Sequence, residues 1–79
     1  MDINYMVATG VIIKEYLEEK NVSNEDLETL LGISKRKVSE LLNGKLALTE
    51  DIANKLEKIL PDIPASYWIN LEKNYQNYL

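Results

Sequence analysis

Three consecutive basic residues, Lys35, Arg36 and Lys37, are the side chains whose type and spacing best suit a chemical task. The segment from Ser34 to Leu46 carries four basic residues and one glutamate, a net charge of +3, although the whole chain carries −4. The remaining residues therefore sum to −7, so the positive charge is concentrated in one place. Such a basic cluster in an acidic chain is typical of a surface that contacts nucleic-acid phosphates.

The basic run also has a plainer interpretation. Arg36 and Glu40 are four residues apart, the spacing of an ion pair on a helix surface. Short basic runs are common on solvated faces, so the charge alone leaves both interpretations open. The segments around the run favour contact with DNA.

The segment before the basic run has the pattern of a short helix that ends at a glycine. Ser23 is a good N-cap, and Asp26 three residues later completes a capping-box-like pair. Three leucines recur at helical spacing, at positions 27, 30 and 31. Gly32 ends the helix because glycine tolerates a left-handed backbone. We expect a helix over residues 24–31.

A second short helix is expected over residues 35–42. Ser34 is its N-cap, Ile33 fills the corner, and Asn43-Gly44 ends it. Val38 and Leu41 would face the core, whereas the outward side chains would be Ser34, Lys35, Arg36, Lys37 and Glu40. Two helices joined by a short glycine-containing turn form the helix-turn-helix pattern of DNA-binding proteins.

Three further helices are expected around this unit. The first is capped by Thr9 and ends at Asn21 in a left-handed conformation, and another follows Thr49 and stops at Pro61. A last helix begins at Pro64 or Ala65 and carries an aromatic stripe: Tyr67, Trp68, Leu71, Tyr75 and Tyr78. Such a stripe more often belongs to the core or to a dimer contact than to a surface on which bases stack.

These elements predict the fold class. With no strand pattern, the chain is all-α, a five-helix bundle. Residues 1–8 form an N-terminal arm, and residues 9–79 form a helix-turn-helix domain with a C-terminal aromatic helix. The arm could pack on the domain, contact a second copy or lead into the first helix.

The composition excludes several function classes. The chain has 79 residues, one small domain, and it contains no cysteine and no histidine. Disulfides, thiol nucleophiles, imidazole bases and nearly all zinc chemistry are therefore absent. The three glycines are far apart in the sequence, where they would mark the ends of elements, and they form no phosphate-binding loop. We expect no enzyme, no cofactor, no membrane segment and a cytoplasmic location.

Three stretches carry a resemblance to a known family: residues 10–19, the Leu-Gly-Ile-Ser to Asn-Gly-Lys unit at 31–45, and the aromatic run at 67–75. With them the chain resembles the XRE-type helix-turn-helix family, the lambda-repressor-like fold. Within that family it is most similar to the HigA-like antitoxins of bacterial toxin–antitoxin pairs. Arg36-Lys37 replaces a frequent Gln-Thr, and Asn24 a common Gln, which implies an operator unlike that of typical members.

The resemblance implies that the second helix of the unit enters the major groove. Ser34, Lys35, Arg36 and Glu40 would then face base edges. Arg36 would read a guanine through O6 and N7, or would pair with Glu40. Glu40 would accept from a cytosine amine, or would orient Arg36.

Four further residues are candidates for phosphate contacts. Lys37 and Lys45 would contribute charge, and Asn24 would add its amide to the free N–H groups of its helix. Asn43 would contact phosphate or act as the helix C-cap. Specific binding by so small a module needs a homodimer on a palindromic double-stranded operator.

The resemblance also implies a protein partner, a small basic ribonuclease toxin. The acidic face that suits such a partner is Glu15, Glu18 and Glu19, with Glu25 and Asp26 beside it. Ordinary solubilising charge explains each glutamate as well. Two alternatives have no toxin: a phage or mobile-element repressor, and the N-terminal DNA-binding part of a longer regulator.

Overall fold

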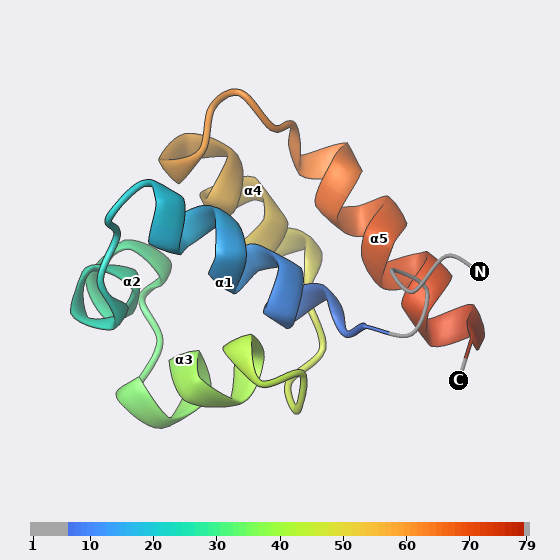
Figure 1. The fold of residues 1–79 in the computed structure, drawn as a ribbon, viewed down its shortest axis with the longest axis horizontal. Helices are drawn as coiled ribbons and strands as arrows, with labels where there is room; N and C mark the ends of the chain where they lie inside the picture. Colours follow the sequence, from blue (N-terminus) through green and yellow to red (C-terminus); the bar gives the residue numbers. More distant parts are fainter. Residues whose placement is uncertain (1–6, 79) are drawn as a thin grey trace.

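The computed structural model describes residues 7–78, which form five helices in the order expected (Figure 1). They are α1 (Thr9–Glu19), α2 (Asn24–Leu31), α3 (Lys35–Leu42), α4 (Glu50–Ile59) and α5 (Ala65–Tyr78). The described part of the chain contains no strand, so the prediction of an all-α five-helix bundle is confirmed. Most of the expected N-terminal arm, residues 1–6, lies outside the described residues, and its placement stays a prediction.

The core takes apolar side chains from all five helices. The fully buried members include Ile13 of α1, Leu27 of α2, Leu41 of α3 and Leu56 of α4. From α5 the core receives Trp68, whose side chain is completely buried. In a domain of this size the core is small, so single contacts between helices matter to its stability.

Local capping signals fix most helix ends. Ser23 and Asp26 form the complete capping box, with N–H to oxygen distances of 3.1 and 3.2 Å. The Thr49 hydroxyl accepts from the Ile52 N–H at 3.2 Å and so begins α4. Asn21 has a φ of 57°, the left-handed conformation expected after the first helix.

The expected role of Thr9 is wrong. Ala8 is the N-cap of α1, without a side-chain cap, and Thr9 is the first helical residue. Its side chain is 1% exposed, and its hydroxyl has no hydrogen-bond partner among the described residues. The helix begins one residue earlier than expected because Ala8 packs against Gly44: a Cβ added at Gly44 would lie 2.5 Å from the Ala8 Cβ.

Gly10 allows α1 to lie directly on α3. A Cβ built at Gly10 would lie 1.5 Å from the Leu41 carbonyl oxygen, so the two backbones touch there. Gly10 lies inside α1, so the prediction that it marks the end of an element is wrong. Gly44, just after α3, has a φ of 78° and lies against Ala8, next to the start of α1.

Two carboxylates tie α5 to the rest of the domain. Glu57 of α4 accepts from the Ala65 N–H at 2.8 Å, at the point where α5 begins. Glu72 of α5 accepts from the Leu48 N–H at 3.3 Å. Both bonds are partly buried and fix the angle of α5 against α4.

We predict that Gly10→Ala lowers the free energy of unfolding by about 3 kcal/mol, because a backbone carbonyl cannot move aside as a flexible side chain can. The better helix propensity of alanine would recover only about 1 kcal/mol. Urea denaturation followed by circular dichroism measures the change. Lys14→Ala, at an exposed position of the same helix, is the control and should stay within about 0.5 kcal/mol of the parent. A Gly10→Ala protein as stable as the parent would contradict the close approach.

Candidate nucleic-acid interface

The turn before α3 is fixed from two sides. Gly32 adopts a left-handed conformation with a φ of 67°, and Ile33 packs against the core. The Lys55 ammonium of α4 donates to the Leu31 carbonyl at 3.1 Å and pairs with Asp51 at 3.1 Å. Lys55 therefore satisfies one of the free carbonyls at the end of α2 and holds the turn against α4.

Helix α3 is oriented by its own apolar side. Ser34 caps it, since its hydroxyl accepts from the Lys37 N–H at 3.2 Å. Val38, Leu41 and Leu42 are buried. With that side held in the core, the opposite side of the helix must face solvent.

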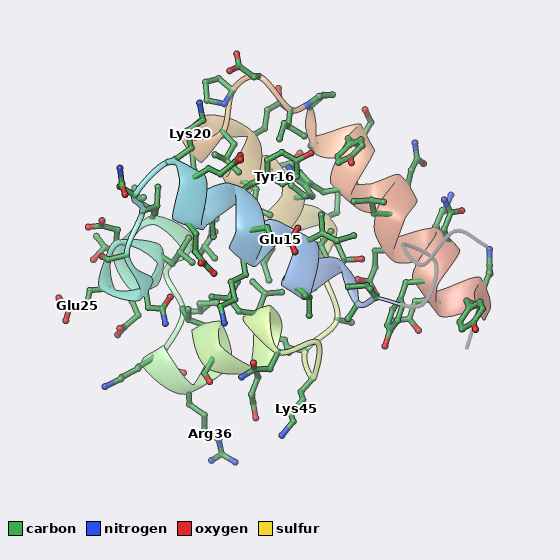
Figure 2. All side chains as sticks on the ribbon, in the orientation of Figure 1. Glu15, Tyr16, Lys20, Glu25, Arg36 and Lys45 are labelled. Carbon is green, nitrogen blue, oxygen red and sulfur yellow. The ribbon has the colours of Figure 1, made fainter. Side chains whose placement is uncertain are left out.

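The outward side of α3 and the loop after it form one basic surface. Figure 2 shows Arg36 and Lys45 pointing in the same direction, away from the body of the domain. We call this the reading surface, a shallow depression lined by six residues: Lys35, Arg36, Ser39, Glu40, Asn43 and Lys45. The structure thus brings five of the eight expected contact residues together in one place.

Arg36 and Glu40 form the expected ion pair, with 3.6 Å between Nε and Oε2. The Arg36 side chain is 87% exposed and that of Glu40 38%. A pair this open is worth about 0.2–1 kcal/mol, less than the discrimination of about 1–3 kcal/mol that a bidentate arginine–guanine contact provides. The pair can therefore orient Arg36 without preventing it from binding a base.

Lys45 is positioned by the backbone of the same helix. The Glu40 carbonyl accepts from the N–H groups of Lys45 and Leu46, at 2.7 and 3.1 Å. The loop therefore folds back onto the end of α3 and carries the Lys45 ammonium to the edge of the reading surface.

Ser39 belongs to the reading surface but was not among the expected contact residues. It follows Lys35 by four positions and Arg36 by three, so helical spacing alone places it on their side. Its hydroxyl accepts from the Asn43 side-chain amide at 3.3 Å. Asn43 is the C-cap of α3, as one interpretation held, and its amide lies along the reading surface.

The other three expected contact residues lie outside the reading surface. Ser34 uses its hydroxyl to cap α3, and Lys37 is exposed on an adjoining side of the helix. Asn24 is the exposed first residue of α2, next to the free N–H groups of that helix. This placement suits contacts with the sugar-phosphate backbone better than contacts with base edges.

Residues 7–78 contain neither a metal-binding cluster nor a membrane-spanning helix. No three histidine, cysteine, aspartate or glutamate residues there gather in a metal-binding group. None of the described helices has the length and apolar character needed to span a membrane.

The geometry agrees with comparisons to known proteins. The family model described as helix-turn-helix, HTH_3, matches residues 13–68, more than half of the chain. The chain belongs to the XRE-type helix-turn-helix family. This family consists of DNA-binding transcriptional regulators, and the predicted resemblance is confirmed.

Two relatives illustrate the range of the similarity. The HTH-type transcriptional regulator YddM of Escherichia coli (strain K12) is 40% identical over 63 residues, 80% of this chain and 66% of that protein. Antitoxin HigA-1 of Vibrio cholerae serotype O1 is 33% identical over 67 residues, 84% of this chain and 62% of that protein. The chain spans between about half and two thirds of the length of its curated relatives.

A solved structure shares the fold. The Pseudomonas aeruginosa antitoxin HigA with the higBA promoter superposes with a TM-score of 0.78 and 27% sequence identity. The match covers 89% of this chain and 76% of that one.

We predict that Lys55→Met lowers the free energy of unfolding by about 1 kcal/mol, because the Leu31 carbonyl loses its donor and Asp51 its partner. Methionine keeps the apolar stem, so the change isolates the ammonium. Lys58→Met, an exposed position of the same helix, is the control and should have a smaller effect. Urea denaturation of both variants measures the difference, and equal losses would show that the bond to Leu31 contributes nothing.

Proposed function

We propose that this protein is a sequence-specific DNA-binding repressor that inserts α3 into the major groove of an operator. One observation supports this most strongly. Helix α3 is held in the core by three buried apolar residues, while its opposite side carries an exposed basic surface in an otherwise acidic chain. Family membership supports the same function.

In this proposal the central residues of the reading surface contact bases. Arg36 reads a guanine, and Glu40 orients its guanidinium or accepts from a cytosine amine. Lys35 and Ser39 lie on the same side of the helix, within reach of neighbouring base edges.

The residues around the reading surface contact the sugar-phosphate backbone. Lys37 and Lys45 supply charge, Asn43 and Asn24 supply amides, and Ser34 begins the helix that enters the groove. Two copies acting as a homodimer would place two α3 helices on the half-sites of a palindrome, about one DNA turn apart.

We further propose that the protein is a HigA-like antitoxin of the cytoplasm that represses its own operon and neutralises a small basic ribonuclease. The similarity to two HigA proteins supports this proposal. The higher identity to YddM, described only as a transcriptional regulator, favours the alternative of a repressor without a toxin. The reading frame beside the gene distinguishes the two, since only an antitoxin needs a neighbour that encodes a basic, toxic protein.

We predict that Arg36→Ala weakens binding to the DNA upstream of its own gene by about 10- to 100-fold, because a bidentate base contact is worth about 1–3 kcal/mol. Gel shifts with the upstream DNA and with a scrambled duplex measure both affinity and discrimination. Only the affinity for the upstream DNA should fall. Lys20→Ala, at the far end of the molecule from Arg36, removes the same charge and should leave both affinities unchanged (Figure 2).

A phosphate contact gives a different result in the same assay. Lys45→Ala should weaken binding to both duplexes alike and reduce the log–log salt slope by about 0.9. If Arg36→Ala behaves in this way too, its role is to supply charge, and the assignment of base reading to Arg36 is wrong.

Repression and toxin neutralisation should be separable by mutation. We predict that Arg36→Glu with Lys37→Glu abolishes operator binding through repulsion of the phosphates, yet still restores growth when co-expressed with the basic protein encoded beside the gene. Growth assays and gel shifts on the same variant test this. Loss of both activities in a folded variant would place the toxin on the reading surface and contradict a separate interface.

A further inference from the structure

A groove between α1 and α5 is not used by the proposed contacts with DNA. It has a volume of about 610 Å³ and is lined from α1 by Ile12, Glu15, Tyr16, Glu18 and Glu19, and from α5 by Tyr67 and Leu71. Helix α1 packs on both α3 and α5, whereas α3 and α5 do not pack on each other in the described chain. The groove therefore lies across α1 from the reading surface, as Tyr16 and Arg36 show in Figure 2.

The aromatic part of the groove is held in place by the core. The rings of Tyr16 and Tyr67 stand edge-on to buried Trp68, at 5.6 and 5.3 Å between centroids and at 85° and 76°. Tyr67 nevertheless remains 40% exposed, one of the few large apolar side chains within residues 7–78 that face solvent. Partial burial, and to a lesser extent the neighbouring Tyr16 hydroxyl, raises the pKa of the Tyr67 phenol from its ordinary value.

The charged rim of the groove is acidic and unpaired. Glu15, Glu18 and Glu19 are exposed, and none of them forms an ion pair with another described residue. Glu18 and Glu19 occupy the last turn of α1, where the negative end of the helix dipole makes carboxylates unfavourable, and the basic residue beside them is the C-cap Lys20.

Tyrosine faces beside free carboxylates form a recognition site for a cationic side chain. A guanidinium can stack on a ring while it donates to a carboxylate, and the apolar floor of Ile12 and Leu71 can bury the stem of an arginine. The groove therefore combines shape, apolar area and charge in the way that a basic protein segment requires.

We propose that the α1–α5 groove is the docking site for an arginine-bearing segment of a basic protein. The choice of partner rests on the proposed function, in which that protein is the ribonuclease that this chain neutralises. Because the reading surface lies on the other side of α1, the docked partner leaves Arg36 and Lys45 free, and the operator and the partner bind at the same time.

The test titrates the full chain with a synthetic peptide of alternating arginine and leucine and follows the fluorescence of Trp68, the single tryptophan. Trp68 lies directly beneath Tyr16 and Tyr67, so it reports occupation of the groove. We expect a saturable change with this peptide and none with its glutamate–leucine counterpart.

A matched pair of variants locates the binding. Glu15→Gln, Glu18→Gln and Glu19→Gln together should weaken binding of the arginine peptide about tenfold, since three rim charges contribute about 1.4 kcal/mol. The control removes three charges outside the groove: Glu28→Gln, Glu50→Gln and Asp62→Asn. It should leave the affinity within about twofold of the parent. Relief of the unfavourable dipole contact should leave the groove variant at least as thermally stable as the parent, so lost binding cannot reflect unfolding.

Several results would overturn the proposal. One is the absence of any fluorescence response to the arginine peptide, and another is equal weakening of binding in both triple variants. A third is that the parent binds no peptide while the groove variant changes from a dimer to a monomer in sedimentation. The last would make the groove a contact between two copies. The peptide assay contains no DNA and no toxin, so its result does not depend on the tests of the proposed function. The groove can bind the peptide even if the protein binds no operator, and the protein can bind its operator even if the groove binds no peptide.

Discussion

The contact between the α1 backbone at Gly10 and the Leu41 carbonyl determines where α3 stands. Because no side chain separates the two backbones, α3 is held by atoms that have little freedom to move. Its basic side is thereby turned away from the domain at a fixed angle. The same helix α1 contributes five residues to the α1–α5 groove, so one element positions the DNA-facing surface and lines the opposite one. A change at Gly10 would therefore disturb both surfaces together.

Bonds from side chains to backbone groups complete this arrangement. Lys55 holds the end of α2, Glu57 holds the start of α5, and Glu72 holds the loop before α4. Each such bond is worth only about 1 kcal/mol. Apolar burial supplies most of the stability of the domain, but it has no direction, whereas these bonds set the angles between helices. In a small core, that directional contribution decides whether the turn before α3 is held in a single geometry.

The helix-turn-helix unit could be predicted from the sequence because its limits depend on local chemistry. The Ser23 and Ser34 caps and the left-handed Gly32 each act within a few residues, and the structure confirms them. The start of α1 could not be predicted, since it depends on contact between Ala8 and Gly44, far apart in the chain. The aromatic stripe of α5 shows the same limit: spacing put Trp68 and Tyr67 in one stripe, but only packing made the first fully buried and left the second exposed. Ser39 differs, because its spacing of four residues from Lys35 and three from Arg36 is enough to place it on their side of the helix.

The separation of charge across the domain links its two surfaces. With a net charge of −4, the chain as a whole is repelled by DNA, and only the +3 segment around α3 offsets that repulsion locally. Part of the acidic excess lies on α1, across the domain from the reading surface. A basic partner in the α1–α5 groove would neutralise this part and so strengthen attraction to phosphate, without any change in the shape of α3. By thermodynamic reciprocity, bound DNA would strengthen attraction to the partner by the same factor. The coupling would weaken as salt is added, because screening shortens the range of charge interactions to about 8–10 Å near physiological ionic strength. That salt dependence would distinguish an electrostatic coupling between DNA and partner from a coupling that is transmitted by movement of the helices.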